Sequence, residues 1–443
     1  MSNGKMSGNR KPYEAAVEEL EGLPRFKGKP TLARMRHLLQ ALGNPQDRLK
    51  VIHVAGTNGK GSVCALLAGI LGAAGIRTGL FTSPHLLSMT ERIQVDGMPI
   101  PEEEFAALYG RVAAAARQGR AGGATFFERL AAMAFLHFAE REVEAVVLET
   151  GLGGLWDATN VVEKPSACII TRIGLDHTEV LGDTLEEVAF QKAGILKAGV
   201  PVVAANDPVE VEKVLESRAL SLDSPWFGAF PYETEILGRT DKSIDFCIRN
   251  KYYRYERLKM GAFCPYQLEN ANLALTWAAV QEDFPAIREE HLRQGLEHFR
   301  WPGRMEFLAP NILLDGAHNT NGMERLVEAL EAGYGDRDLE ILLAVKEGKA
   351  FEGMLEALVR LPNLRRLGFC PIRTVEGIPP SVLEEKAKAL RNDLDTVSLE
   401  DFRETLLAYM HQEREAEKPL LCCLGSLYFI AEVRGFFEEV CKE

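Results

Sequence analysis

The sequence has no C-x-x-C pair among its eight cysteines and no apolar run long enough to span a membrane. The first absence argues against a zinc ribbon, and the second argues against a membrane protein. Several cysteines lie inside apolar runs such as SACIIT and LLCCLG, which predicts reduced, buried thiols. The N-terminal stretch MSNGKMSGNRKPYEAA is polar and lacks the apolar core of a signal peptide. We therefore expect a cytoplasmic protein.

An excess of basic residues is also missing. The chain has 51 Lys and Arg against 64 Asp and Glu, a formal net charge of −13. This balance argues against a broad nucleic-acid-binding surface. Its 443 residues, 46% of them hydrophobic, are enough for two or three ordinary globular domains.

Strand-like apolar runs alternate with helical patterns in the first half of the chain. Helices are expected over 60–75, 126–140 (amphipathic), 184–197 and 268–283. The strand-like runs are VIHVAG (51–56), TGLFT (78–82), VEAVVLET (143–150), SACIITRI (166–173) and VPVVAAN (200–206). This alternation predicts an α/β domain with a mostly parallel sheet. Polar, aromatic-rich runs over 226–260 predict β hairpins appended to that sheet.

The α/β alternation begins again after Trp301-Pro302-Gly303, which we interpret as a domain link. Strands are expected at NILLDGA, EILLAV, LRRLGFC and PLLCCLG, with helices over 321–333 and 426–440. We therefore predict a first domain over 1–300 and a smaller, Rossmann-like α/β domain over 301–443.

The stretch HVAGTNGKGSV (53–63) resembles a phosphate-binding loop but departs from the G-x-x-x-x-G-K-[ST] pattern. Val54 stands where that pattern has Gly, and Gly61 stands where it has Ser or Thr. The strand, glycine-rich turn and helix start are nevertheless all present, and Lys60 adds a positive charge. We predict a phosphate loop of a different design from that of P-loop kinases and GTPases. Because Gly61 has no hydroxyl, magnesium must be held by residues elsewhere.

Polar side chains follow three of the predicted strands. Ser83 and His85 follow one, Glu149 ends another, and Asp176 with His177 follows a third. The carboxyl ends of parallel strands form the ligand crevice of an open sheet, so together these residues predict a magnesium–nucleotide site. Taken singly, Glu149 could cap a helix and His177 could be a satisfied loop histidine.

Lys192 lies among apolar residues in VAFQKAGILK, on a predicted helix. The sequence alone does not exclude a surface lysine whose stem covers apolar neighbours.

Seven motifs in order identify a family: GTNGKGS, TSPHL…ERI, ETGLGG..DATNVV, LDHTEVLG, QKAGILK, WPGRME and DGAHN. They resemble folylpolyglutamate synthase and bifunctional dihydrofolate synthase within the Mur ligase superfamily. The resemblance extends from about residue 30 to GSLYFIAEV near the C-terminus.

The resemblance implies an ATP-dependent ligase and a set of site residues. Those expected to bind ATP are Thr57, Asn58, Gly59, Lys60, Gly61, Ser62, Asn272, Arg304, Asp315 and His318. Two magnesium ions would be held by Ser83, Glu149, His177 and a carbamylated Lys192. The implied catalytic residues are Lys60, Lys192, His177 and Glu149. The pterin would lie against Thr125, Phe126, Phe127 and Glu128, against Trp156, Asp157 and Ala158, and near the chain from Lys27 to Lys29.

The implied reaction adds L-glutamate to the γ-carboxylate of a folate through an acyl phosphate, with release of ADP and phosphate. Two departures from the family pattern concern the substrate. Leu155 replaces an Arg that usually precedes the D-A-T-N motif, and VKEGKAFEG (345–353) replaces a D-K-D-type turn.

Other functions remain open at this point. The enzyme could also act on dihydropteroate, as a bifunctional dihydrofolate synthase. It could be an ATP-binding paralogue with a changed substrate or without ligase activity. A Mur ligase for cell-wall nucleotide precursors is disfavoured, because no UDP-binding domain fits before residue 50. The resemblance also suggests a monomer.

Overall fold

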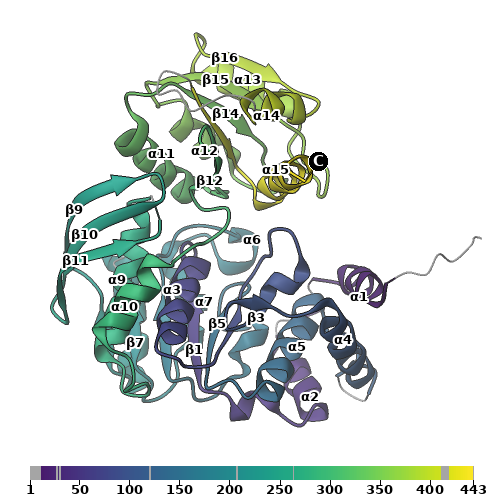
Figure 1. The fold of residues 1–443 in the computed structure, drawn as a ribbon. Helices are drawn as coiled ribbons and strands as arrows, with labels where there is room; N and C mark the ends of the chain where they lie inside the picture. Colours follow the sequence, from purple (N-terminus) through teal and green to yellow (C-terminus); the bar gives the residue numbers. More distant parts are fainter. Residues whose placement is uncertain are drawn as a thin grey trace, which may run out of the picture. The chain divides into compact units, whose positions relative to one another are not determined.

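The computed structural model describes residues 11–25, 28, 31–118, 121–205, 208–262, 264–410 and 419–442. The chain forms two compact units (Figure 1), which are described separately. The first unit comprises residues 1–235, 246–259 and 269–299, and the second comprises 236–245, 260–268 and 300–443. The sequence predicted a single domain boundary at residue 300. The structure also groups two short earlier segments, 236–245 and 260–268, with the second unit.

The main sheet of the first unit is mostly parallel, as predicted. Its strand order is β4-β3-β2-β5-β1-β6-β7-β8, and only β3 and β4 run antiparallel to their neighbours. The bounds are β1 (Val51–Ala55), β2 (Thr78–Phe81), β3 (Ile93–Val95), β4 (Met98–Pro99), β5 (Ala145–Glu149), β6 (Ala167–Ile170), β7 (Val202–Ala204) and β8 (Trp226–Gly228). β1, β5 and β6 are buried along their whole length, which explains their continuous apolar sequences.

Helices cover this sheet and form a further helical layer. The bounds are α1 (Pro12–Glu21), α2 (Ala33–Ala41), α3 (Lys60–Ala73), α4 (Glu102–Ala116), α5 (Phe126–Glu140), α6 (Thr178–Leu181), α7 (Leu185–Lys192), α8 (Val209–Ser221), α9 (Tyr266–Val280) and α10 (Glu289–Glu297). Short 3₁₀ helices are η1 (Pro45–Arg48), η2 (Met89–Arg92), η4 (Ala158–Val161) and η5 (Ala193–Ile195).

Helix α5 has the predicted bounds, but the predicted amphipathic character is wrong. Most of its residues are buried, because α1, α2 and α4 pack on it in addition to β2. Sequence patterns had not indicated these three covering helices.

The aromatic-rich region after residue 226 also differs from the prediction. Only β8 extends the main sheet; β9 (Glu233–Thr240), β10 (Ser243–Arg249) and β11 (Arg254–Met260) form a separate sheet in the order β11-β10-β9. Two residues join β9 to β10, a link that antiparallel neighbours allow. The predicted hairpins are therefore present but are not appended to the main sheet.

The second unit has the predicted smaller α/β fold. Its sheet order is β12-β13-β17-β14-β15-β16, parallel except for the β12–β13 pair. The strands are β12 (Glu306–Ala309), β13 (Ile312–Leu314), β14 (Leu339–Leu343), β15 (Leu364–Phe369), β16 (Asp395–Ser398) and β17 (Leu420–Leu424). The helices are α11 (Thr320–Tyr334), α12 (Phe351–Leu358), α13 (Pro380–Leu390), α14 (Arg403–Met410) and α15 (Leu427–Val440).

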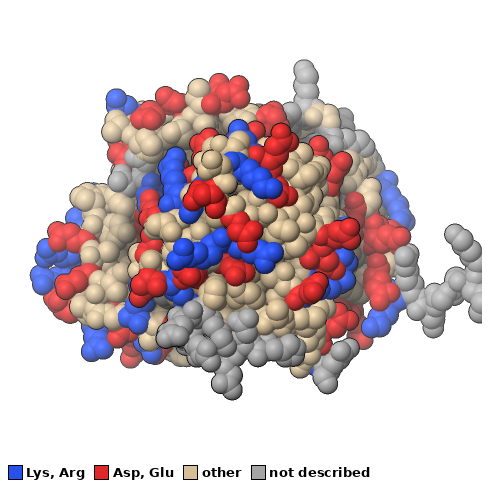
Figure 2. All heavy atoms as spheres, turned by 90° about the horizontal axis from the view of Figure 1, so that it is seen from above, with Lys and Arg blue, Asp and Glu red and all other residues tan. Residues whose placement is uncertain are grey.

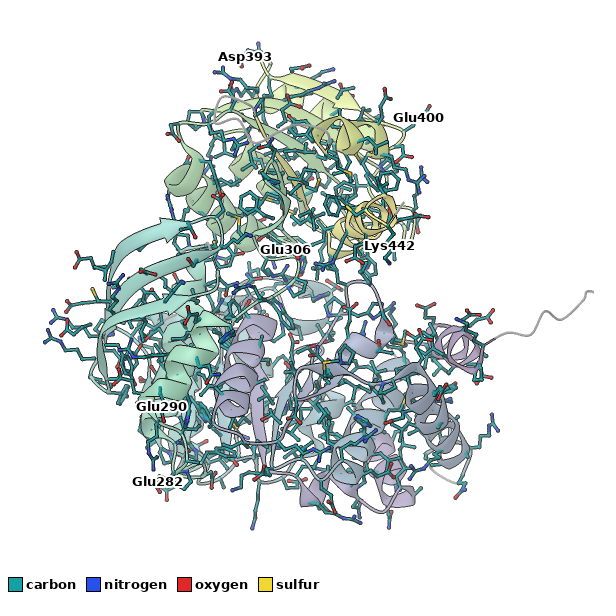
Figure 3. The ribbon with its side chains drawn as sticks, in the orientation of Figure 1. Glu282, Glu290, Glu306, Asp393, Glu400 and Lys442 are labelled. Carbon is teal, nitrogen blue, oxygen red and sulfur yellow. The ribbon has the colours of Figure 1, made fainter. Side chains whose placement is uncertain are left out.

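The surface carries charges of both signs. Figure 2 shows Lys and Arg side chains interspersed with Asp and Glu on the face that it displays. The acidic excess includes the exposed carboxylates of Glu290 and Asp393, the second of which lies at the outer edge of the molecule in Figure 3. The eight cysteines are free thiols, six of them buried. No helix in the described ranges is both long and apolar enough to cross a membrane.

Candidate nucleotide and ligase site

The stretch Gly56–Gly59 is the turn between β1 and α3. The helix begins at Lys60, and Gly59 precedes it in a left-handed conformation with φ 87°. Gly61 and the buried Ser62 lie in the first turn of α3, at the end of the helix towards which its backbone N–H groups point. This is the geometry by which helix N-termini bind phosphate.

Two glycines of this turn are required by close neighbours. A Cβ on Gly56 would lie 2.9 Å from Thr171 Cβ and closer still to Thr171 Oγ1. A Cβ on Gly59 would lie 3.3 Å from Asn270 Cγ and would overlap Asn270 Oδ1. The turn is therefore enclosed by a residue after β6 and by a residue of α9.

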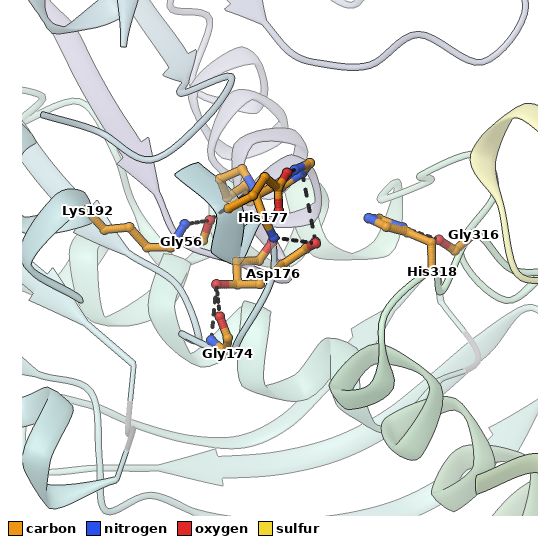
Figure 4. Close-up of polar contacts among 10 residues, drawn as sticks. Gly56, Gly174, Asp176, His177, Lys192, Gly316 and His318 are labelled. Atoms are coloured by element: carbon orange, nitrogen blue, oxygen red, sulfur yellow. Dashed lines mark hydrogen bonds and ion pairs between the residues drawn. The ribbon is translucent and has the colours of Figure 1, made fainter. Parts of the chain in front are cut away.

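Two lysine amines meet at the carbonyl of Gly56. Lys60 Nζ donates to Gly56 O at 3.0 Å and to Thr57 O at 3.1 Å. Lys192 Nζ donates to the same Gly56 O at 2.8 Å, as Figure 4 shows. Lys192 is only 3% exposed, so the alternative of a snorkelling surface lysine is wrong.

Glu149 and Ser83 lie together at the carboxyl ends of neighbouring strands. The backbone N–H of Ser83, just after β2, donates to Glu149 Oε2 at 2.9 Å. Glu149 ends β5 and is 3% exposed, with Val54 of β1 as its register partner. The carboxylate is therefore on the strand next to the phosphate loop.

His177 lies on the loop after β6. Its side chain is 44% exposed, and its ring nitrogens are 4.0 Å from Asp176 and 3.7 Å from Glu179 (Figure 4). Its participation in a metal site with Glu149 stays a prediction. His85, on the loop after β2, accepts a hydrogen bond from Arg92 at its Nδ1, and burial lowers its pKa to about 3.

The side chains at hand suit a magnesium ion. Glu149 and Ser83 supply oxygen, the ligand type that magnesium prefers. In the described chain no group of three or more His, Cys, Asp and Glu side chains is arranged for a metal. The predicted ligands include only two residues of those types, so the set depends on the Ser83 hydroxyl and a modified Lys192.

Some of the predicted pterin-binding residues at the start of α5 make hydrogen bonds and an ion pair within the protein. Thr125 caps the helix in a capping box with Glu128, which also forms a buried ion pair with Arg34 at 2.8 Å. Glu128 is therefore a structural residue here rather than a substrate contact open to solvent. Phe126 has the guanidinium groups of Arg25 and Arg92 at 5.4 Å from its ring centroid. Lys27 and Lys29 lie outside the described residues.

Phe127, also on α5, packs against the loop that carries the other predicted substrate segment. A Cβ on Gly151 would lie 2.6 Å from Phe127 Cε1, so α5 is packed closely against the loop that follows β5. In that loop Trp156 is 50% exposed, whereas Ala158 is buried. Trp156 is therefore the residue of this segment that is most open to a ligand.

Asp157 holds the same loop in place. Its carboxylate accepts from the backbone N–H groups of Gly151 and Leu152 and from the Thr159 hydroxyl at 2.5 Å. Burial raises the pKa of Asp157. Thr159 also bonds His53 Nε2 at 2.8 Å, and burial lowers the pKa of His53 to about 3.

Asn272 does not lie where an ATP contact was predicted. It is completely buried, its Nδ2 donates to Ala229 O, and its Oδ1 accepts from Asn250 and Tyr253. Asn270, two residues earlier, is the one that lies against the phosphate loop. Because one helical turn has 3.6 residues, a shift of two positions moves a side chain to the opposite face. To choose between Asn270 and Asn272 as the residue beside the loop, one must know which face of α9 meets Gly59.

The predicted ATP residues of the second unit lie around one turn. Asp315 is 2% exposed and accepts from Tyr266 Oη at 2.8 Å and from Met305 N at 2.9 Å. Burial raises the pKa of Asp315. Arg304 Nη1 donates to Gly303 O, and His318 Nδ1 lies 2.8 Å from Gly316 O (Figure 4). Their contacts with ATP stay predictions.

The fold and the loop define a nucleotide-binding enzyme of the Mur ligase class. Residues 54–278 match the Mur ligase middle domain, and residues 306–436 match the dihydrofolate synthetase C-terminal domain. The chain is 33% identical to the dihydrofolate synthase/folylpolyglutamate synthase of Bacillus subtilis, with 95% of this chain and 98% of that protein covered. It belongs to the family of folylpolyglutamate synthases and dihydrofolate synthases, which are ATP-dependent ligases.

Solved structures agree with this assignment. The folylpolyglutamate synthase of Thermotoga maritima superimposes with a TM-score of 0.81 at 31% identity, covering 96% of both chains. That of Mycobacterium tuberculosis complexed with ADP has a TM-score of 0.84 at 28% identity, covering 96% of this chain and 98% of that one. A further relative was solved with AMPPCP, an ATP analogue, and folate.

Proposed function

We propose that this enzyme uses ATP to join the amino group of L-glutamate to the γ-carboxylate of a folate. ADP and phosphate are the other products. The observation that carries the proposal is the phosphate loop, with the lysine amines of Lys60 and Lys192 at its first carbonyl. Membership of the family over nearly the whole chain supports the substrate class.

The energetic problem is that a carboxylate is a poor acyl donor. In the proposed reaction an oxygen of the γ-carboxylate attacks the terminal phosphorus of ATP, and ADP leaves. The amine of glutamate then attacks the carbonyl carbon of the acyl phosphate, phosphate leaves, and the amine gives up a proton. Positioning and charge stabilisation supply most of the catalysis of such phosphoryl transfers.

We assign the phosphate contacts to the first turn of α3 and to Lys60. The N–H groups there would donate to the phosphate oxygens, and Lys60 would give up its bonds to the loop carbonyls and donate to the phosphates instead. Magnesium, when bound, would neutralise charge on the phosphates. Ser83, Glu149, His177 and a carbamylated Lys192 would hold it. Carbamylation replaces one N–H of the neutral Lys192 amine with a carboxylate from carbon dioxide and releases a proton.

Bifunctional activity is the second candidate. It is favoured by the match to the dihydrofolate synthetase C-terminal domain and by the bifunctional relative from Bacillus subtilis. In that reaction the carboxylate of dihydropteroate takes the place of the folate γ-carboxylate.

The test is ADP release by the purified protein with magnesium, ATP and L-glutamate. Separate reactions contain tetrahydrofolate, dihydropteroate or neither, and mass spectrometry identifies the products. Release with tetrahydrofolate alone supports the synthase, and release with both supports the bifunctional enzyme. No release above the reaction without acceptor would overturn the proposal and favour a paralogue with a changed substrate. Lys60→Met should abolish release, whereas Lys251→Met, an exposed lysine, should not.

We further propose that the enzyme acts in the cytoplasm as a monomer. The eight free thiols support a reducing compartment. Light scattering after size-exclusion chromatography should give a mass near 49.1 kDa, and a mass near twice that value would contradict the monomer.

A further inference from the structure

The phosphate loop is held on one side by the segment that follows β6. The backbone N–H groups of Thr57 and Asn58 both donate to Arg172 O, at 2.9 and 3.2 Å. Thr171 Oγ1 donates back to Asn58 O at 2.7 Å. Two consecutive residues after β6 therefore determine where the loop backbone lies.

The start of α9 holds the other side of the loop. Asn270 packs against Gly59 so closely that no side chain fits at that glycine. Glu269, the residue before it, is an acidic residue in the first turn of the helix. The loop thus lies between two segments that are almost 100 residues apart in sequence.

One ion pair joins these two segments. Arg172 Nε and Nη2 both donate to Glu269 Oε2, at 3.1 and 3.0 Å. The side chains are 24% and 25% exposed, less than in most of the other ion pairs of this protein. Arg172 contacts the loop through its own carbonyl, and the preceding residue, Thr171, contacts it as well. Glu269 is followed directly by Asn270, which packs against Gly59 of the loop.

We propose that the Arg172–Glu269 ion pair positions the phosphate loop for ATP. The pair sets the separation between the end of β6 and the start of α9, and so the path of the loop between them. Loss of the pair lets the segments separate, which moves the loop N–H groups relative to the phosphates. The inference rests on the proposed use of ATP. It predicts weaker binding of nucleotide with little change in the affinity for folate, because both partners adjoin residues that contact the phosphate loop, whereas the predicted folate contacts are on α5 and at Trp156.

A direct contact of Arg172 with phosphate is the main competing explanation. In that case Arg172 would leave Glu269 when ATP binds, and Glu269 would act as a competitor for the guanidinium. Reversing both charges distinguishes the two explanations. The variant R172E/E269R keeps an ion pair between the segments but places a negative charge where a phosphate-binding Arg had been.

The experiment uses the full chain and the variants R172Q, E269Q, R172E/E269R and R172K. R111Q is the control, since it breaks the exposed Arg111–Glu140 pair between α4 and α5 of the same unit. The dissociation constants of ADP and AMPPCP are measured by calorimetry, and the KM values for ATP and folate are measured separately. Circular dichroism and thermal melting establish that each variant is folded.

We expect R172Q and E269Q each to weaken nucleotide binding roughly two- to fivefold, the range of a modest ion pair expressed as affinity. The folate KM should change less than about twofold, and R172E/E269R should recover most of the lost nucleotide affinity. R172K and R111Q should bind nucleotide nearly as the native chain does. If R172Q and E269Q do not fold, the charge-reversed variant still decides the question.

Three results would overturn the inference. They are normal binding by E269Q with weak binding by R172Q, failure of the reversed pair to recover affinity, or equal losses for nucleotide and folate. Nucleotide binding is measured without turnover. A native chain that binds ADP but forms no product would therefore refute the proposed function and leave this inference standing.

Discussion

Replacing Gly59 with Ala tests the geometry of the phosphate loop most directly. Gly59 has φ 87°, where an L-residue costs about 1–2 kcal/mol. The new methyl carbon would also lie 3.3 Å from Asn270 Cγ and overlap its Oδ1. Asn270 is 9% exposed and is enclosed by its neighbours, so relief requires a shift of α9 or of the loop. Forcing an extra methyl group into a packed site adds roughly 1–3 kcal/mol.

The total predicted loss of unfolding free energy for Gly59→Ala is about 2–5 kcal/mol in the first unit. The assay is urea unfolding followed by tryptophan fluorescence, with calorimetric titration of ADP on the folded protein. ADP affinity should fall at least tenfold, since the loop and α9 cannot both keep their positions. The double variant Gly59→Ala/Asn270→Ala should recover the part of the stability loss that is due to the overlap.

Gly110→Ala is the matched control. Gly110 lies inside α4 with no atom near the position of its Cβ, so Ala should stabilise by about 0.5–1 kcal/mol and leave ADP binding unchanged. The reasoning is refuted if Gly59→Ala unfolds like the native chain and binds ADP normally.

The remaining predictions concern buried charge. Arg34→Met leaves the carboxylate of Glu128 without its ion-pair partner, in a pair whose side chains are 18% and 8% exposed. Arg34→Met should lower the free energy of unfolding in urea by about 3 kcal/mol, and Arg34→Met/Glu128→Gln should recover part of this loss. A loss below about 1 kcal/mol for Arg34→Met would contradict a structural role for the ion pair. His53 has a native pKa of about 3 against 6.5 unfolded, because burial disfavours its charged ring. Between these two pKa values His53 binds a proton only in the unfolded chain. The free energy of unfolding should therefore fall by ~1.4 kcal/mol per pH unit as the pH drops from 6.5 towards 3. His53→Gln, which can still bond Thr159, should flatten this slope, and the exposed His298→Gln should not; equal slopes would refute the assignment.

The sequence alone predicted the elements whose signals are local. β1 and α3 follow from a continuous apolar run, a glycine-rich turn and a helical period. The residues at the carboxyl ends of β2 and β5 could be grouped because parallel strands place those ends along one edge. The seven ordered motifs added the family, and with it the activity. Helices α1, α2 and α4 were not recognised, and none of the motifs that identified the family lies on them.

The tertiary structure decided which of the predicted residues are available to a ligand. The sequence could not show that Glu128 is paired with Arg34, since the partners lie 94 positions apart. It could not choose between Asn270 and Asn272, because that choice depends on which face of α9 meets Gly59. Burial decided the status of Lys192, which sequence left open between surface and site. Local sequence determines period and turn chemistry, whereas hydrogen-bond partners and burial arise only when distant segments pack together.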